Sequence, residues 1–537
     1  MTGTRDIDCP PSSTAGAEGC PPASIDTADI PAQRISVADR PPVTALHDQR
    51  YRDAWPSSRA SRQDVRCRGG ALREQVLTVE PAGAAPTAER QFEPSLDRDR
   101  LHNMLSTLAR KYQVPGAQLA IHHRGETLAI EVGELRYGAG RPVTRDAAFP
   151  IGSITKAFTA TLAMILVADG DIDLDAPLSE HLPELGALGD ELNLHQLLSH
   201  TSGFANEPVN EVRASSIRRY VLDHCCRQNL VLPPGTAFSY SNMGYILVGH
   251  LIETVTGMSW REAMESILLV PLGIEPMFIG APQRRPLATG HSVRLADGRT
   301  RPVEQSMAPG EAPTGGLAMS AVDLVKLGVT HFNSALLPAA YAQQMRQAVP
   351  IADPSWGWAD GWGLGLAVFG TGDTAWVGHF GACVGTSCEV RFDPFSGCIV
   401  AFTSNAKRGM WYELVDELRV SGLAVKDCSD AGVQERQIVP PPGCPGSYQN
   451  GNVEVSIAIT ETGTLNFTTG DAAAEFICFD DLSFFAPTQP KIRGRFLRDP
   501  ISGDIDGFKY GLYVFHRQLA TRTNRQHVPG TATARAS

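Results

Sequence analysis

The pattern of apolar and polar positions first becomes regular about one hundred residues into the chain. Residues 1–95 are rich in Pro, Ala, Ser, Arg and Asp and keep neither a period of 3.6 nor a period of 2 over the length of an element. This composition predicts a disordered N-terminal tail, or a reading frame that starts too early. Order is expected from residue 96 onward, because Leu101, Met104, Leu105 and Leu108 recur at helical spacing.

Residues 96–426 combine strand-like and helical patterns. A hairpin is expected where AQLAIHH and TLAIEVG flank Arg124-Gly125, and a helix is expected over 154–168. A mostly helical, loop-rich middle runs to about residue 335 and contains PPGTAFSYSNMGYILVGHLIETVTG, a turn leading into an amphipathic helix. Strand-like segments then return in GLGLAVFG, TAWVGHFG, SCEVRFDP and GCIVAFTSN, before a last helix in YELVDELRVSGLAV. Strands at both ends with helices between them predict an α+β domain whose antiparallel sheet joins the two ends.

The C-terminal part of the chain has a different pattern. Residues 427–444 are Pro-rich and aperiodic and are expected to form a linker. In NVEVSIAIT the apolar residues alternate, and TLNFTT, EFICFD, LSFFAP and YGLYVFH continue as short strands. Residues 445–537 are therefore predicted to form a separate small β-barrel with a short C-terminal tail.

Composition and charge narrow the possible partners. The net charge of -11 over 537 residues, without a basic face, argues against nucleic acid. The apolar runs are too short to span a bilayer, and the N-terminus has no signal-peptide pattern, so we expect a cytoplasmic protein without a membrane partner. The eleven Cys include no CxxC pair and are expected to be ordinary reduced thiols.

Neither a metal nor an organic cofactor is expected. The sequence contains no GxGxxG and no GxxxxGK[ST], so nothing supports a nucleotide. The segment ADGDIDLDAPLSE resembles a calcium loop, but Leu174 stands where the turn of such a loop needs Gly. His200 and the pair His122-His123 lack metal-ligand spacing. The absence of GxSxG also disfavours an α/β-hydrolase.

Two Ser-x-x-Lys pairs are present, although only about 0.4 are expected by chance in a chain with seven Lys. Ser404/Lys407 follows a strand and is assigned to chance. Ser153/Lys156 stands where a Gly-containing turn meets a helix, so the i, i+3 spacing places the ammonium beside the hydroxyl. Burial of Lys156 would lower its pKa and let it accept the Ser153 proton. The alternative is that Ser153 is a simple helix N-cap, which the spacing does not exclude.

Two later segments supply further polar groups. FSYSNMGY offers the Tyr240 phenol and the Asn242 amide on a loop before a helix, and a Tyr near a cationic Lys can carry a proton to a leaving group. VGHFGACVG places His379 and Gly381 on a strand, where the next N–H, at Ala382, can face an acyl oxygen. Taken singly, Tyr240 also fits a core phenol and His379 a structural histidine.

The motifs FPIGSITKAF, LLSHTSGF, PPGTAFSYSNMGY, PTGGLAMSAVDL, GWGLGL and GHFG occur in one order over about residues 98–425. In this order and rough spacing the chain resembles the serine β-lactamase / penicillin-binding-protein family, on its class C, D,D-peptidase and esterase side. The resemblance implies that Ser153 is the acylated nucleophile, Lys156 its base partner and Tyr240 the proton shuttle.

The same resemblance implies roles for the remaining groups. Asn242 would hold a substrate amide, His379 and Gly381 would line the third wall, and the Ser153 and Ala382 N–H groups would form the oxyanion hole. One departure is the third motif, which is His-Phe-Gly where β-lactamases and D,D-carboxypeptidases of this group usually have Lys-Thr-Gly. It argues against efficient β-lactam hydrolysis. His-x-Gly is similar to the D-aminopeptidase and esterase branches and to stand-alone thioesterases that release and cyclise nonribosomal peptides.

The sequence thus predicts a metal-free enzyme that forms an acyl-Ser153 intermediate on a peptide amide or ester, with D-residues in the substrate, and hydrolyses it. One alternative is a peptide cyclase that takes a carrier-bound peptidyl thioester and closes a macrolactam. A second alternative is a non-catalytic binding protein on the same fold. The C-terminal barrel resembles the lipocalin-like domains of D-aminopeptidases and of those cyclases, and we expect it to shape access to the cleft.

Overall fold

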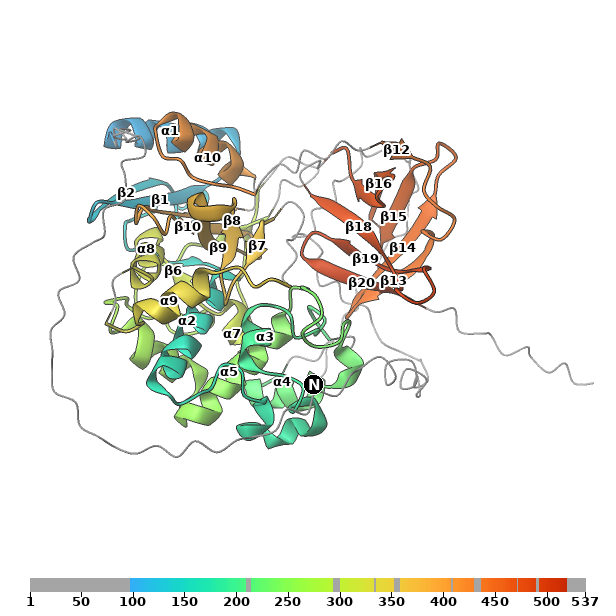
Figure 1. Ribbon diagram of the computed structural model, residues 1–537. Coiled ribbons are helices and arrows are strands. Elements are labelled where there is room, and N and C mark those ends of the chain that lie inside the picture. The colour runs from blue at the N-terminus through green and yellow to red at the C-terminus, as the bar shows by residue number, and fades with distance from the viewer. Residues whose placement is uncertain are drawn as a thin grey trace, which may run out of the picture. The chain divides into compact units, whose positions relative to one another are not determined.

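The computed structural model, shown in Figure 1, describes residues 97–208, 214–292, 300–332, 335–351, 358–406, 409–428, 436–470, 472–488 and 492–518. The tail expected over residues 1–95 and the short tail at the C-terminus lie outside these residues.

A seven-stranded antiparallel sheet joins the two ends of the first domain, as the sequence predicts. Its order is β2-β1-β11-β10-β9-β8-β7, so that β1, an early strand, pairs with β11, a late one. The hairpin expected around Arg124-Gly125 is β1 and β2. The strands are β1 Gly116–His123, β2 Glu126–Gly133, β7 Gly361–Trp362, β8 Ala367–Phe369, β9 Trp376–Cys383, β10 Thr386–Phe392 and β11 Ile399–Ser404.

Helices cover both faces of this sheet. Helices α1 (Arg98–Lys111) and α10 (Met410–Val420) pack together on one face, above the strands in Figure 1. On the other face lie α2 (Ile154–Asp169) and α8 (Ala321–Thr330). The helix expected over 154–168 is therefore confirmed as α2, and its apolar length is buried because it runs through the centre of the domain.

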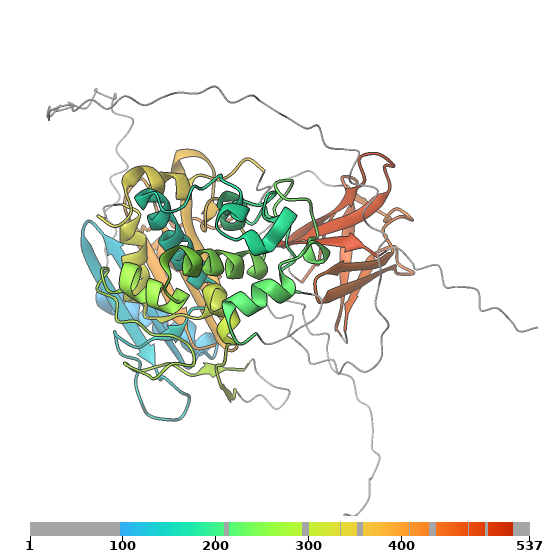
Figure 2. The ribbon, with the colours of Figure 1, turned by 90° about the horizontal axis from the view of Figure 1, so that it is seen from below.

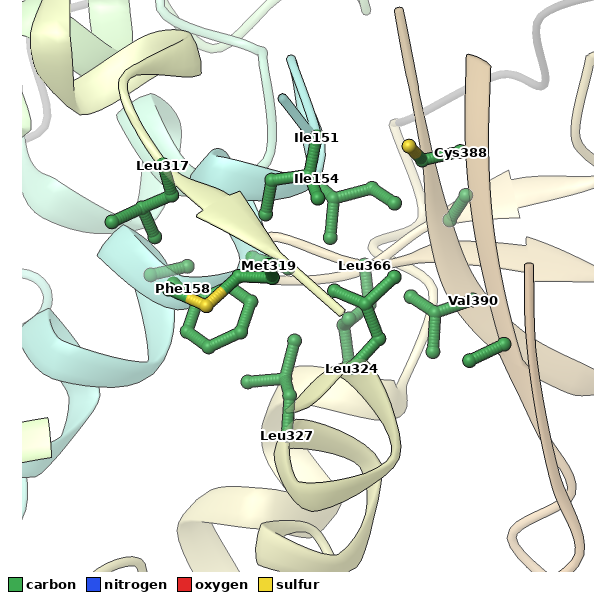
Figure 3. Close-up of a cluster of buried hydrophobic side chains, with 14 of the residues drawn as sticks. Ile151, Ile154, Phe158, Leu317, Met319, Leu324, Leu327, Leu366, Cys388 and Val390 are labelled. Carbon is green, nitrogen blue, oxygen red and sulfur yellow. The ribbon is translucent and has the colours of Figure 1, made fainter. Parts of the chain in front are cut away.

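Figure 3 shows how α2 is fixed against the sheet. Ile154 and Phe158 of α2 meet Leu324 and Leu327 of α8, and Val390 of β10 closes the cluster from the sheet side. All five side chains are fully buried. This close-packed core sets the position of the N-terminal end of α2 relative to the strands.

Six further α-helices of the described residues form the rest of the helical layer, which lies toward the viewer in Figure 2. They are α3 Leu194–Leu198, α4 Ile217–His224, α5 Asn242–Thr256, α6 Trp260–Ala263, α7 Ala312–Gly315 and α9 Ala339–Arg346. Two small antiparallel pairs complete the domain, β3 Phe149–Pro150 with β6 Ala318–Met319 and β4 Gly290–His291 with β5 Pro302–Val303.

The C-terminal strands form the predicted β-barrel, orange to red in Figure 1. The order β16-β15-β14-β13-β20-β19-β18-β17 is closed by pairing of β16 with β17. Aromatic side chains pack in its interior: the Phe467 ring centroid lies 4.3 Å from that of Phe476 and 5.0 Å from that of Phe484. The strands are β13 Gly446–Asn450, β14 Val453–Ile459, β15 Leu465–Thr469, β16 Ala472–Phe479, β17 Ser483–Phe485, β18 Arg493–Arg498, β19 Ile505–Tyr510 and β20 Tyr513–Arg517.

One further strand lies inside the stretch that the sequence predicts to be linker. Strand β12, Gln437–Ile438, pairs with Cys478 and Phe479 of β16. A two-residue strand is too short to show a period of 2, so it has no signal in the sequence pattern.

Candidate active site

The turn that leads into α2 lies directly against strand β9 because two glycines meet there. Gly152 has φ +52°, and a Cβ added to it would lie 2.3 Å from the Ala382 carbonyl oxygen and 2.7 Å from the Ala382 nitrogen. A Cβ on Gly381 would lie 2.0 Å from the Ile151 carbonyl oxygen. Only glycine leaves room for so close a backbone approach. The structure therefore brings Ser153 next to Ala382, although the two are far apart in the sequence.

Ser153 occupies the N-cap position of α2, but its hydroxyl does not cap the helix. The residue has φ −62° and ψ −12°, and its side chain makes no capping hydrogen bond. Instead the Ser153 Oγ accepts a hydrogen bond of 3.2 Å from the Lys156 Nζ. Ser153 is also partly exposed. The helix thus begins at the position that the N-cap interpretation predicts, but the hydroxyl is hydrogen-bonded to Lys156 and partly exposed to solvent instead of capping the helix.

Lys156 is fully buried, and in the described part of the chain no carboxylate is hydrogen-bonded to its ammonium group; the Glu207 carboxylate acts on it only through its charge. Its Nζ donates a second hydrogen bond, of 3.0 Å, to the Thr314 carbonyl oxygen at α7. Burial lowers the pKa of Lys156 to about 7, because the charged form loses its hydration. Near neutral pH a large fraction of the amine is therefore uncharged and can take a proton from the neighbouring hydroxyl.

Tyr240 lies over the same ammonium group. The Lys156 Nζ is 5.0 Å from the centroid of its ring, and the side chain is 4% exposed. Burial raises the pKa of the phenol well above 10, and hydrogen bonding toward Ser153 lowers it in part. Within the described residues the hydroxyl makes no hydrogen bond of regular geometry. Tyr240 is thus a neutral phenol that keeps its proton beside Ser153 and Lys156.

Asn242, the first residue of α5, belongs to a second group of contacts. Its Nδ2 donates to the carboxylate of Glu207, and its backbone N–H donates to the Asn206 carbonyl oxygen at 3.1 Å. The side chain is therefore held by the 206–207 loop. Its Oδ1 carries the lone pairs that a substrate N–H requires.

His379 lies on β9, two residues before Gly381, and is fully buried. Its Nδ1 is 2.6 Å from the Phe380 carbonyl oxygen, which can only accept, so the Nδ1 carries the proton and the Nε2 a lone pair. The Nε2 is buried with no hydrogen-bond partner among the described residues. Burial and then the charge of Lys156 lower the pKa of His379 to about 3, so the imidazole is neutral. The β9 side of the site, which His379 and Gly381 line, thus offers the His379 Nε2 as a hydrogen-bond acceptor, and the His379 side chain carries no positive charge.

The second Ser-x-x-Lys pair has a different environment. The Ser404 hydroxyl donates to the carbonyl oxygens of Ser387 and Ala406 at 3.0 Å and 3.1 Å, inside the sheet. Its sequence partner Lys407 lies outside the described residues. A buried hydroxyl bonded to backbone carbonyls is a structural one, in keeping with the assignment of this pair to chance.

Sequence reasoning missed three contributors to the site. The carbonyl of Thr314, from the motif PTGGLAMSAVDL, binds the Lys156 ammonium. Glu207 holds Asn242. His200, which the sequence analysis considered only as a metal ligand, stacks on Tyr240. Thr314 and His200 could have been found from the sequence, because they stand in PTGGLAMSAVDL and LLSHTSGF, two of the motifs that carry the family resemblance. Glu207 stands in none of these motifs.

The barrel hairpin between β19 and β20 also contacts the Tyr240 segment. The Tyr240 N–H donates to the Leu512 carbonyl oxygen at 2.9 Å, and the Val514 N–H donates to the Ser239 Oγ at 3.3 Å. The ring of Tyr513 stands edge-on to that of Tyr240, with 6.3 Å between centroids. The hairpin is thus hydrogen-bonded to the segment that carries the phenol.

A second barrel element reaches the Asn242 loop. Asn450, at the end of β13, donates from Nδ2 to the Val514 carbonyl oxygen at 2.8 Å and accepts at Oδ1 from the Asn206 N–H at 3.0 Å. Asn206 in turn accepts the backbone N–H of Asn242. One barrel side chain therefore links strand β20 to the loop that positions the Asn242 amide.

In the described ranges, no group of three or more His, Cys, Asp or Glu side chains is arranged to hold a metal ion. A search of the same residues for a helix with the length and apolarity to cross a bilayer finds none.

The sheet, the start of α2 and the order of the motif segments together define the architecture of the serine β-lactamases and penicillin-binding proteins. Residues 100–423 match the family model Beta-lactamase. Penicillin-binding protein 4 of Amycolatopsis lactamdurans is 30% identical over 371 residues, which cover 65% of this chain and 94% of that protein. Esterase EstB of Burkholderia gladioli is 27% identical over 327 residues, 52% of this chain and 80% of that protein. The chain belongs to the β-lactamase family and is a serine hydrolase of that family.

Solved structures agree with this assignment. The crystal structure of SurE is 38% identical and covers 78% of this chain and 99% of that chain, with a TM-score of 0.70. SurE with D-Leu matches with the same identity and coverage and a TM-score of 0.69. D-amino acid amidase from Ochrobactrum anthropi SV3 shares the fold, with a TM-score of 0.53. It is 24% identical in sequence, and the match covers 60% of this chain and 98% of that chain.

Proposed function

We propose that the protein is an acyl-transfer enzyme in which Ser153 attacks an amide or ester carbonyl of a peptide with D-residues. The observation that carries the proposal is the buried Lys156 amine, which is hydrogen-bonded to the Ser153 Oγ at 3.2 Å and has its pKa lowered to about 7. A base of this pKa beside a partly exposed hydroxyl is what activation of a serine nucleophile requires at neutral pH.

The reaction would proceed through an acyl-enzyme. The neutral Nζ of Lys156 takes the Ser153 proton as the Oγ bonds to the carbonyl carbon, and the resulting oxyanion lies between the Ser153 and Ala382 N–H groups. The bond to the leaving group breaks as Tyr240 gives that group its proton, and Tyr240 recovers a proton from the Lys156 ammonium. Water then attacks the acyl carbon, Lys156 takes its proton, and Lys156 returns a proton to the Ser153 Oγ as the acyl bond breaks, so that acyl-Ser153 is hydrolysed.

Recognition of D-residues is supported by similarity, and the preference for a substrate without a carboxylate at the scissile bond is supported by charge. SurE, 38% identical over most of this chain, has been solved with D-Leu. Beside the nucleophile, the neutral His379 supplies no cation for a carboxylate next to the scissile bond, and Asn242 supplies an amide acceptor. A peptide amide or ester without a carboxylate at that position therefore fits the site better than a β-lactam does.

The test is intact-mass spectrometry with matched D- and L-aminoacyl p-nitrophenyl esters, a fluorophosphonate and benzylpenicillin. We expect a Ser153 adduct with the fluorophosphonate and faster turnover of the D-ester. We expect benzylpenicillin to acylate at least about tenfold more slowly than the ester, since a lost charge-assisted contact costs that much or more. Ser153→Ala should form no adduct.

The second Ser-x-x-Lys pair provides the matched control. Ser404→Ala removes a hydroxyl that is bonded only to backbone carbonyls, so labelling should persist. If a folded wild-type protein forms no Ser153 adduct with either the ester or the fluorophosphonate, the proposal is refuted in favour of the binding-protein alternative.

A peptide cyclase is the second candidate, and the barrel hairpin against the Tyr240 segment favours it. Lys156 is fully buried and the hairpin lies beside this segment, so a peptide held over the partly exposed Ser153 would keep water from the acyl-enzyme. A carrier-bound peptidyl thioester would then be the acyl donor and the amine of the same peptide the acceptor. Incubation with a linear peptidyl thioester distinguishes the candidates, because a cyclase yields the macrolactam and a hydrolase yields only the linear acid.

A further inference from the structure

His200 holds the backbone on both sides of Tyr240. The residue follows α3 and has φ +56°, a conformation that non-glycine residues seldom adopt. In this conformation its carbonyl oxygen accepts the Ser239 N–H at 3.0 Å, and its Nδ1 accepts the Ser241 N–H at 3.1 Å. The two residues that flank Tyr240 are thus both hydrogen-bonded to His200.

The imidazole ring also stacks on the phenol. The centroids of the His200 and Tyr240 rings are 4.1 Å apart, with 28° between their planes. The imidazole is itself enclosed, since the rings of Tyr245 and Trp362 lie 4.9 Å and 5.2 Å from it. Its side chain is fully buried. A ring so enclosed has one orientation, and the face it presents limits the tilt of the phenol.

The contact is between neutral groups. Burial, and then the charge of Lys156, lower the pKa of His200 well below 6.5. Because the Nδ1 accepts from a backbone N–H, the proton of the neutral ring is on the Nε2. An imidazolium would carry a second proton on the Nδ1, directed at the Ser241 N–H, and would lose this hydrogen bond.

This packing matters because the phenol has little else to orient it. In the described part of the chain the Tyr240 hydroxyl makes no hydrogen bond of regular geometry. Its direction toward Ser153 therefore depends largely on the contacts of its ring. The Lys156 Nζ lies 5.0 Å from the ring centroid, and among the aromatic neighbours the stacked imidazole is nearer than Trp362 at 5.7 Å and Tyr513 at 6.3 Å.

We propose that His200 is a positioning residue that fixes the Tyr240 phenol for proton donation to the leaving group. The inference rests on the proposed function. It makes a specific chemical prediction, because proton donation matters only for a leaving group that departs poorly as an anion. An amide nitrogen must gain a proton as the carbon–nitrogen bond breaks, whereas p-nitrophenolate leaves as the anion. A misplaced phenol should therefore slow amide cleavage and spare the nitrophenyl ester.

The test compares one D-aminoacyl group as its amide and as its p-nitrophenyl ester. In His200→Asn the Oδ1 replaces the Nδ1 as acceptor and Asn tolerates positive φ, so mainly the ring is lost. We expect kcat for the amide to fall about 10- to 100-fold and kcat for the ester less than about threefold, with KM nearly unchanged. Tyr240→Phe should show the same pattern, and the double variant should lose no more than Tyr240→Phe alone.

Two further variants keep the result interpretable. His331→Asn is the matched control, because His331 is also buried and stacked on an aromatic ring, that of Phe392 at 5.2 Å, and should leave the amide-to-ester ratio unchanged. His200→Phe keeps an aromatic ring but not the acceptor, and should keep the amide-to-ester ratio within about threefold of wild type. This second variant tests the stacking claim even where His200→Asn folds poorly by thermal melting.

The outcomes distinguish the positioning role of His200 from the proposed function itself. Equal losses on amide and ester, additive losses in the double variant, or a tenfold lower ratio in His200→Phe would each overturn the positioning role alone. No acyl-Ser153 in the wild-type protein with either substrate would overturn the proposed function and this inference with it.

Discussion

The acidity of Lys156 leads to a quantitative prediction for the pH dependence of acylation. Burial lowers the pKa of this amine from 10.5 to about 7. About half of the molecules then hold a neutral amine at pH 7, compared with about one in 3000 for an exposed lysine. Because only the neutral amine takes the Ser153 proton, the acylation rate should fall about tenfold per pH unit below pH 6 and level off above about pH 8.

The same burial lowers the stability of the fold. Between pH 7 and 10.5 the unfolded chain holds a proton on Lys156 that the folded chain has lost, so the contribution of this site to stability rises with pH across that interval. The difference between 10.5 and about 7 corresponds to about 5 kcal/mol of destabilisation below pH 7, at about 1.4 kcal/mol per tenfold change. Lys156→Met removes this penalty and loses the hydrogen bond to the Thr314 carbonyl, which offsets about 1–2 kcal/mol.

Lys156→Met is therefore expected to abolish acylation and to stabilise the folded protein at pH 7 by about 2–4 kcal/mol. The assays are the rate of fluorophosphonate labelling of Ser153 between pH 5 and 9 and urea denaturation at pH 7. Lys326→Met, at a side chain that is 37% exposed, is the control and should change stability by less than about 1 kcal/mol. A labelling rate that is flat from pH 6 to 8, or a Lys156→Met variant less stable than wild type, would contradict the role of a buried, largely neutral Lys156 as the base.

The contacts around the site predict two further effects. Gly381→Ala should prevent labelling of Ser153 and destabilise the fold by about 3 kcal/mol or more, because the new Cβ would lie 2.0 Å from the Ile151 carbonyl oxygen. Gly409→Ala is the control, since a Cβ added there would have no heavy atom within 4 Å. This control should change neither the rate of labelling nor the urea denaturation curve. Asn450→Ala should lower kcat about tenfold, because it releases the loop of Asn242, and should cost about 1–3 kcal/mol of stability, because its two buried partners lose their hydrogen bonds. Asn466→Ala on the same barrel should leave kcat unchanged, and equal kcat values for the two variants would contradict the link between barrel and site.

Much of the fold follows from local patterns. The helical spacing of Leu101, Leu105 and Leu108 predicted α1, and their side chains are buried against the sheet. The alternation in NVEVSIAIT predicted β14, in which Val455 and Ile457 are buried. Such patterns are readable because a helix or strand repeats its own geometry every few residues, whatever lies beyond it. The short strand β12 has no such repeat and went unnoticed.

That Ser153 and Lys156 share one helical turn follows from their spacing in the sequence, since the i, i+3 spacing is a property of the helix alone. The burial of Lys156 beside Thr314 and Tyr240, which lowers its pKa, depends on how distant segments fold together. The stacking of His200 on Tyr240 and the barrel contacts were likewise settled in three dimensions. The physical reason is that desolvation and ring packing depend on atoms brought together from distant segments, and no spacing within one segment records them.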